Sequence, residues 1–201
     1  MNIAVLVSGN GSNLQALIDA ETKGDLGGGK ITLVVSDKPA AYALERARKA
    51  NIGIFVAEAD RSVPREDYDR KIVRKLQEKK IGLVILAGFM RILSPYFVDA
   101  YEGCMLNIHP ALLPAFKGAH GIKDALEYGV KITGVTVHFV NKELDAGPVI
   151  LQECVRVEEQ DTLDMLEEKL HVVEHRLYPE AVRLFVGGKL KIEGRKVRIL
   201  P

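Results

Sequence analysis

Three polar side chains in the second half of the chain could act together in acid–base chemistry. Asn107 and His109 close the apolar run Cys104–His109, which Pro110 terminates. Because side chains alternate along a strand, both should leave the same face. Asp145 follows in the turn after a second apolar run. An imidazole beside a carboxylate can serve as a general acid or base, and a neutral amide can stabilise an oxyanion. We interpret the three as one catalytic constellation.

The histidines leave other chemistries open. His109, His120 and His138 fall within thirty residues of one another, so a metal site or a set of buried structural histidines competes with acid–base catalysis. No two of these three are four residues apart, the spacing that a helical metal site favours, and we predict no metal. A Gly-x-Ser-x-Gly elbow is absent, and both cysteines, Cys104 and Cys154, sit in strand-like runs that we expect to be buried. Direct acyl transfer to an amine, or hydrolysis, remains.

A glycine loop near the amino terminus predicts an anion site. Residues 2–7 are a continuous apolar run, the loop Ser8–Asn13 contains two glycines, and a helical pattern follows. Glycines allow close backbone approach to an anion, and the free N–H groups of a helix start point at it. Leu14 stands where a dinucleotide fingerprint would have its third glycine. We interpret the loop as phosphate-binding, with a tight strand-to-helix turn as the alternative and Ser12 or Asn13 as the helix cap.

These sites need a framework of strands that alternate with helices. The pattern predicts an α/β protein with a three-layer α/β/α, doubly wound, mostly parallel, Rossmann-like sheet of about seven strands. We expect strands at 2–7, 31–36, 54–57, 83–87, 104–109, 133–140 and 148–157 and a hairpin at 189–200. We expect helices after residue 13 and at 42–50, 65–80, 122–128 and 161–186. One domain, 1–201, would comprise a phosphate-binding half, 1–100, and a catalytic half, 101–201. The apolar loop Gly88–Pro95 suits a flat ring system.

The composition of the chain argues against nucleic acids and membranes as partners. The 28 basic and 27 acidic residues give a net charge of +1, and apolar residues make up 47%. A near-neutral chain has no strong field for nucleic acid or an anionic membrane, and no segment approaches the roughly 20 apolar residues that span a bilayer. Two isolated cysteines predict free thiols in a reducing compartment. We expect a cytoplasmic protein that acts on small molecules.

Five stretches together resemble one family. The chain is similar to the folate-dependent glycinamide ribonucleotide formyltransferases of purine biosynthesis, from its first strand to the helix that ends near Phe185. The matching stretches are Ser8–Gln15, Leu86–Pro95, Leu106–Pro110, Val137–Val140 and Leu144–Pro148.

The resemblance implies a reaction and a set of contacts. The formyl group of 10-formyltetrahydrofolate would pass directly to the amine of glycinamide ribonucleotide, with no metal, and Asn107, His109 and Asp145 would be catalytic. His109, kept protonated by Asp145, would donate the proton.

Ribonucleotide contacts would come from Gly11, Ser12, Asn13, His171 and Glu174. Folate contacts would come from Arg65, Met90, Arg91, Ile92, Leu93, Asn107, Asn141, Lys142, Glu143 and Leu144. Supporting residues would be His120, Thr136 and His138. The protein would be a monomer or a homodimer.

Several alternatives accompany this expectation. Formyltetrahydrofolate hydrolase shares the catalytic residues, but it needs no ribonucleotide phosphate site. Methionyl-tRNA formyltransferase adds an RNA-binding domain, for which this chain has no room, and the near-zero net charge argues against tRNA. A nicotinamide oxidoreductase with Asp37 on a ribose, and a non-catalytic nucleotide-binding module, come from other classes.

Overall fold

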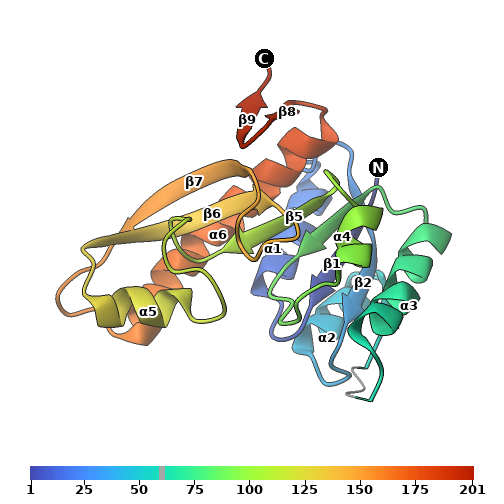
Figure 1. Cartoon of the computed structure of the whole chain (residues 1–201), viewed down its shortest axis with the longest axis horizontal. Coiled ribbons are helices and arrows are strands. Elements are labelled where there is room, and N and C mark those ends of the chain that lie inside the picture. Colours follow the sequence, from blue (N-terminus) through green and yellow to red (C-terminus); the bar gives the residue numbers. More distant parts are fainter. Residues whose placement is uncertain (59–61) are drawn as a thin grey trace.

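Within residues 1–58 and 62–201, the part of the chain that the computed structural model describes, nine strands form a single sheet with helices on both faces (Figure 1). The strands are β1 (Asn2–Val7), β2 (Lys30–Ser36), β3 (Gly53–Val56), β4 (Leu83–Leu86), β5 (Met105–His109), β6 (Ile132–Phe139), β7 (Val149–Arg156), β8 (Leu190–Glu193) and β9 (Lys196–Ile199). The helices are α1 (Ser12–Lys23), α2 (Tyr42–Lys49), α3 (Arg65–Glu78), α4 (Pro95–Ala100), α5 (Gly121–Tyr128) and α6 (Leu163–Val186).

The strand order is β3-β2-β1-β4-β5-β6-β7-β9-β8. The first five strands are parallel, and β6 and β7 continue the sheet antiparallel. The chain order reverses between β1 and β4, and open α/β sheets bind ligands beyond the carboxyl ends of the strands at such a point. The loops after β1, β4 and β5 all leave from that edge.

The predicted α/β class and the doubly wound, mostly parallel sheet are confirmed, but about seven strands is too few. The carboxyl-terminal hairpin was expected as a separate tail, and it joins the same sheet because β9 pairs with β7 through Val149 and Lys196. Figure 1 shows this hairpin beyond the end of α6. The short helix α4 was not expected. Ser94 caps it by accepting a bond from the Phe97 N–H, and Pro95 is its first residue, a start signal visible in the sequence.

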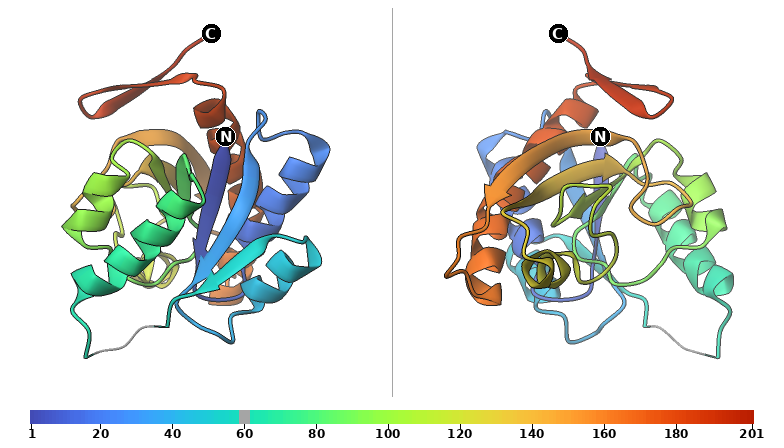
Figure 2. Two further views of the ribbon diagram at one scale, coloured as in Figure 1. Left: turned by 90° about the vertical axis from the view of Figure 1, so that its right-hand side faces the viewer. Right: turned by 60° about the vertical axis from the view of Figure 1, so that its left-hand side comes forward.

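Alternate residues of each central strand feed two separate cores. On β1, Ile3, Val5 and Val7 face α1, α2 and α6, whereas Ala4 and Leu6 face α3 and α4, and Figure 2 shows these helices on opposite sides of the sheet. All five side chains have no exposed surface. Burying an aliphatic side chain of this size contributes about 1.5–3 kcal/mol, and burial on both faces explains why the strands read as unbroken apolar runs.

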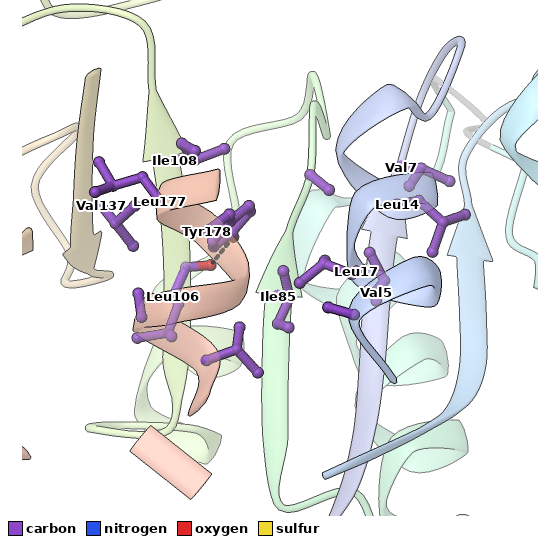
Figure 3. Packing of buried hydrophobic residues seen from close by; sticks show 14 of the residues in the cluster. Val5, Val7, Leu14, Leu17, Ile85, Leu106, Ile108, Val137, Leu177 and Tyr178 are labelled. Atoms are coloured by element: carbon purple, nitrogen blue, oxygen red, sulfur yellow. Dashed lines mark hydrogen bonds between the residues drawn. The ribbon is translucent and has the colours of Figure 1, made fainter. Parts of the chain in front are cut away.

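Tyr178 fastens α6 to the centre of the sheet. Its side chain is fully buried, and its hydroxyl lies 2.9 Å from the Leu86 carbonyl oxygen and 3.1 Å from that of Leu106. Figure 3 shows Tyr178 of α6 among the buried side chains of this core. Burial raises the pKa of Tyr178 well above its ordinary value, so the hydroxyl remains a donor to the Leu86 and Leu106 carbonyl oxygens at any working pH.

We expect Tyr178→Phe to lower the free energy of unfolding by about 1–2 kcal/mol, because the buried carbonyl oxygens lose their donor while the ring still fills its space. Urea unfolding measures this difference. The matched control is Tyr128→Phe, whose ring is 80% exposed, and it should leave the free energy unchanged. Equal stability of Tyr178→Phe and the unaltered protein would contradict the expectation.

Candidate active site

The structure brings Asn107, His109 and Asp145 together at the carboxyl end of β5. The Asn107 amide nitrogen lies 3.4 Å from one Asp145 carboxylate oxygen. The His109 Nδ1 atom lies 3.6 Å from the other. His109 is 4% exposed and Asp145 is 9% exposed, so their interaction is little screened by solvent.

Asp145 reaches this position through an unusual backbone conformation. Its φ is +48°, in the left-handed region that few residues other than Gly, Asn and Asp adopt. The turn between β6 and β7 thereby points the carboxylate at the end of β5. The Gly118 N–H donates a 2.8 Å hydrogen bond to Asp145 Oδ2. The loop between β5 and α5 therefore closes over the same carboxylate.

His138 belongs to the cluster more directly than the sequence suggested. It is the cross-strand partner of Asn107 on β6, and the Asn107 amide nitrogen lies 3.2 Å from its Nε2. Burial lowers the pKa of His138, although the Phe139 carbonyl and Asp145 oppose the shift. The ring is then neutral, with Nδ1 donating to the Phe139 carbonyl oxygen at 2.8 Å. Its Nε2 is left to accept the Asn107 amide hydrogen.

The His109 ring lies between two oxygen acceptors. Its Nε2 lies 2.7 Å from the Phe116 carbonyl oxygen, and its Nδ1 faces Asp145. Phe116 has a φ of +48°. A Cβ on Gly121 would lie 3.2 Å from His109 Nε2 and 2.9 Å from the Phe116 oxygen, so only glycine lets α5 begin this close to the ring. Two acceptors match the two N–H groups of a protonated imidazole.

The other two predicted supporting residues adjoin the cluster: Thr136 on β6 is the cross-strand partner of His109, and His120 directly precedes Gly121, which lies against the His109 ring. The Thr136 hydroxyl donates to the Ala111 carbonyl oxygen at 2.7 Å and accepts from the Leu113 N–H at 3.1 Å, so it holds the loop after β5. Gln152 donates to the same hydroxyl at 2.9 Å, a contact that the sequence analysis missed. His120 is exposed and immediately precedes α5, where its side chain makes no capping hydrogen bond.

The predicted ribonucleotide residues meet where α1 and α6 pack together. The Asn13 amide donates a 2.9 Å hydrogen bond to Glu174 Oε2. The His171 Nε2 lies 3.9 Å from the same oxygen. Asn13 Oδ1 and His175 Nε2 are buried without a hydrogen-bond partner among the described residues. Buried unpaired polar atoms at a helix start suit a polar ligand.

Glu174 is a buried carboxyl on the inner face of α6. It is 4% exposed, and burial raises its pKa, although the Asn13 amide and His171 act in the opposite direction. His171 and His175 are four residues apart and stack with ring centroids 5.9 Å apart. This pair has the four-residue spacing of a helical metal site, which the sequence prediction did not consider. No group of three or more His, Cys, Asp or Glu side chains placed to hold a metal is found in the described part of the chain.

The predicted cap of the helix after the glycine loop is wrong. Neither Ser12 nor Asn13 caps α1, because Gly11 is the N-cap residue at φ +77° and no side chain caps the helix. Arg46 of α2 contacts the same loop. It donates to the Asn10 carbonyl oxygen at 3.0 Å and to Asn10 Oδ1 at 2.9 Å, and its guanidinium carbon lies 4.9 Å from the centroid of the Tyr42 ring. Arg46 thus holds the glycine loop against α2.

A groove of about 780 Å³ extends from this loop between α1 and α6. Ser12, Gln15, Arg46 and His175 line the part of it next to the loop. The groove is open and mixed in charge, and one of the residues that line it, His175, has the buried, unpaired Nε2 atom.

The predicted folate residues lie in two loops and at one helix start. Met90, Ile92 and Leu144 are 65%, 62% and 54% exposed, which is unusual for large apolar side chains and suits a ring ligand. Asn141 closes its own turn through the Ala146 carbonyl and the Glu143 N–H, and Lys142 pairs with Asp99 at 2.7 Å. The remaining residues are Arg65, the exposed first residue of α3, Arg91, whose guanidinium lies 4.4 Å from the Tyr68 ring centroid, and Leu93, which packs against the second core.

One expectation about the cysteines is wrong. Cys154 is exposed, because alternate residues of β7 face away from the core, and Cys104 is only partly buried. The objection to a cysteine nucleophile therefore rests on the position of Cys154 outside the cluster rather than on burial. As for membranes, no helix in residues 1–58 and 62–201 is long and apolar enough to span one.

A doubly wound sheet with an acid–base cluster and a glycine loop on its carboxyl edge is typical of enzymes that act on phosphorylated small molecules. A family model described as Formyl transferase matches residues 1–182. The chain belongs to the formyl transferase family, and it is an enzyme of group transfer.

Similar proteins carry a more specific name. The phosphoribosylglycinamide formyltransferase of Escherichia coli (strain K12) is 47% identical over 192 residues, which cover 96% of this chain and 90% of that protein. The crystal structure of glycinamide ribonucleotide transformylase 1 from Symbiobacterium toebii superimposes with a TM-score of 0.96 at 45% identity, covering 100% of this chain and 94% of that one.

A third relative is much longer. The trifunctional purine biosynthetic protein adenosine-3 of Chironomus tentans is 44% identical over 194 residues, which cover 96% of this chain but only 14% of that protein. The similarity concerns one segment of a protein with further parts.

Glu174→Gln should raise the melting temperature at pH 7. The raised pKa means that ionisation is costlier in the folded than in the unfolded protein. The carboxyl therefore loses its favourable contribution as pH rises above the ordinary value of 4.5. Glutamine has no charge to bury and can still accept the Asn13 hydrogen bond. Scanning calorimetry between pH 4.5 and pH 8 should show that the increase in melting temperature over the unaltered protein becomes smaller as the pH is lowered.

Glu168→Gln is the matched control for this experiment. Glu168 is an exposed carboxylate on the same helix, and its substitution should change the melting temperature little at any pH. A Glu174→Gln variant that is less stable than the unaltered protein at pH 7 would show that the carboxylate is net stabilising where it stands.

Proposed function

We propose that the chain transfers the formyl group of 10-formyltetrahydrofolate directly to the primary amine of glycinamide ribonucleotide. The products are formylglycinamide ribonucleotide and tetrahydrofolate, a step of purine (IMP) biosynthesis. The observation that carries the proposal is the cluster of Asn107, His109 and Asp145 at the end of β5, on the same edge of the sheet from which the glycine loop after β1 and the apolar loop after β4 leave. The names of the relatives support the acceptor.

The chemistry follows from the positions of these groups. The amine attacks the formyl carbon, and the carbonyl oxygen gains negative charge in a tetrahedral intermediate. His109 donates a hydrogen bond to that oxygen. As the bond between the formyl carbon and N10 of the folate breaks, N10 takes a proton from His109, and the proton that the attacking amine loses returns to His109. Asp145 orients the imidazole and stabilises its charged form.

Asn107 needs a small rearrangement for its role as oxyanion donor. Its amide hydrogens face His138 Nε2 at 3.2 Å and Asp145 Oδ1 at 3.4 Å. The longer bond to Asp145 is the weaker of the two. An intermediate that carries full negative charge can compete for that hydrogen, whereas the bond to neutral His138 keeps the amide oriented.

The substrates occupy the two sides of the cluster. The phosphate binds the backbone N–H groups of Gly11, Ser12 and Asn13, and the ribose hydroxyls bind Glu174, with His171 beside it. The pterin ring lies between two segments, 90–93 and 141–144, and Arg65 faces the carboxylates of the glutamate tail. Residues 1–201 form one domain whose two halves hold these parts. The enzyme acts in the cytoplasm, requires no metal, and works as a monomer or a homodimer.

A formyl-transfer assay tests the proposal. Purified protein and 10-formyltetrahydrofolate are mixed with and without glycinamide ribonucleotide, and both tetrahydrofolate and the formylated product are followed. Product that depends on the ribonucleotide supports the transferase. Folate release without an acceptor would identify a hydrolase instead, and absence of turnover in both mixtures would favour a binding module. Membership of the formyl transferase family removes the basis for the nicotinamide oxidoreductase.

Asp145→Asn should reduce turnover about 10²–10⁴-fold, because it removes the charge that stabilises the imidazolium while keeping the shape of the side chain. Ribonucleotide affinity should change less than about twofold, since the carboxylate acts on the transition state. Stopped assays and calorimetric titration measure the two quantities. Asp164→Asn, at an exposed position on α6, is the control and should match the unaltered enzyme. Parallel losses of affinity and rate would contradict the assigned role.

Gly11→Ala should raise the KM for the ribonucleotide without a comparable loss of kcat. A Cβ at Gly11 would lie 2.6 Å from the Cβ of Ala43, so the loop must shift away from α2. Gly24→Ala is the matched control, because Gly24 at the other end of α1 has the same left-handed backbone (φ +80°) but open space around it. Both variants carry the backbone strain, and only Gly11→Ala should affect the KM. Equal KM values would place the phosphate elsewhere.

A further inference from the structure

Ser8 occupies the point where the two substrate loops leave the sheet. It is the first residue after β1, and it is 3% exposed. Its backbone N–H donates to the Gly88 carbonyl oxygen at 3.1 Å. Its hydroxyl oxygen accepts a 2.9 Å hydrogen bond from the Met90 N–H. Both partners lie in the loop after β4, so one residue of the glycine loop holds two backbone groups of the apolar loop.

The topology makes this link direct. β1 and β4 are adjacent parallel strands within the sheet, paired up to Leu6 and Leu86. The chain leaves β1 toward the phosphate-binding loop and leaves β4 toward the pterin-binding loop. Ser8 is therefore built into the first loop and hydrogen-bonded to the second.

Other contacts of both loops lead outward, away from this junction. Asp69, a buried residue of α3, accepts the Ser94 N–H at 2.6 Å at the far end of the apolar loop. On the other side, the Gly9 carbonyl oxygen accepts the Ala43 N–H at 3.1 Å, which fastens the glycine loop to α2. Because the outer side of each loop is fixed to a different helix, a shift of one loop at the junction is passed to the other loop through the hydrogen bonds of Ser8.

We propose that Ser8 is a positioning residue that couples the two substrate sites. An occupied phosphate loop fixes Ser8, and Ser8 fixes the Met90 backbone against which the pterin packs, so each ligand strengthens the binding of the other. Coupling of this kind is reciprocal by thermodynamic necessity. The inference rests on the proposed function, because it assigns one substrate to each loop. Ser8 touches neither reacting group, and its effect passes through the backbone of residues 88–90.

The test measures binding of both ligands without turnover. Tetrahydrofolate has no formyl group to transfer, so its dissociation constant is measured by calorimetric titration, with and without saturating glycinamide ribonucleotide. The ratio of the two constants is the coupling factor. The unaltered protein should give a factor above 1. Ser8→Ala should bring the factor close to 1 and weaken tetrahydrofolate binding about fivefold, the usual effect of one lost hydrogen bond. Its affinity for the ribonucleotide alone should be unchanged.

Two further variants separate positioning from folding. Ser8→Thr keeps the hydroxyl oxygen and should restore much of the coupling. Ser36→Ala is the matched control, because Ser36 is fully buried at the carboxyl end of the neighbouring strand β2, and the hydrogen bonds of its hydroxyl within the described residues are to Lys38 in its own turn. Ser36→Ala should keep the coupling factor of the unaltered protein. Melting temperatures verify that all three variants fold.

The outcomes distinguish this inference from the proposed function. If the unaltered protein binds neither ligand, the proposed function fails and the inference falls with it. If both ligands bind and Ser8→Ala retains the full coupling factor, or if the unaltered protein has a factor of 1, the inference alone is overturned. A loss of coupling in Ser36→Ala as large as that in Ser8→Ala would also overturn it, because a general disturbance of the sheet edge would then explain both.

Discussion

The need to compensate one buried carboxylate explains how the catalytic edge is assembled. Asp145 is 9% exposed, and an ionised carboxylate away from water must find donors nearby or lose its charge. Its partners come from three separate segments: Gly118 in the loop after β5, Asn107 and His109 on β5, and His138 on β6. The position of each segment is thus tied to the same group, and the left-handed backbone of Asp145 brings the group to them.

The two histidines beside that carboxylate have different hydrogen-bond partners. Burial keeps His138 neutral, and its Nδ1 is committed to the Phe139 carbonyl, so His138 can only accept from Asn107 and fixes the orientation of the amide. His109 instead faces an oxygen atom at each of its two ring nitrogens. Two identical side chains therefore differ in function because of what lies next to each ring nitrogen.

Much of this arrangement was predictable from the sequence where the cause is local. The shared face of Asn107 and His109 follows from the two-residue period of a strand, and the buried parallel strands follow from their unbroken apolar runs. Contacts that depend on register or on packing between distant segments were not predictable. His138 lies opposite Asn107 only because β6 pairs with β5 in one particular register, and Arg46 reaches Asn10 only because α2 packs beside the glycine loop. The added pairing of β9 with β7 has no local signal either.

In the proposed reaction, the hydrogen bond between His109 and the Phe116 carbonyl oxygen would discriminate between the substrate and its transition state. The free enzyme already satisfies His109 Nε2 with a neutral oxygen at 2.7 Å. A formyl oxygen that replaces it exchanges one neutral acceptor for another and gains little. An oxyanion in the same place is a much stronger acceptor and does gain. The Phe116 carbonyl thus competes with every incoming oxygen for His109 Nε2, and the substrate oxygen gains from replacing it only once that oxygen has become charged.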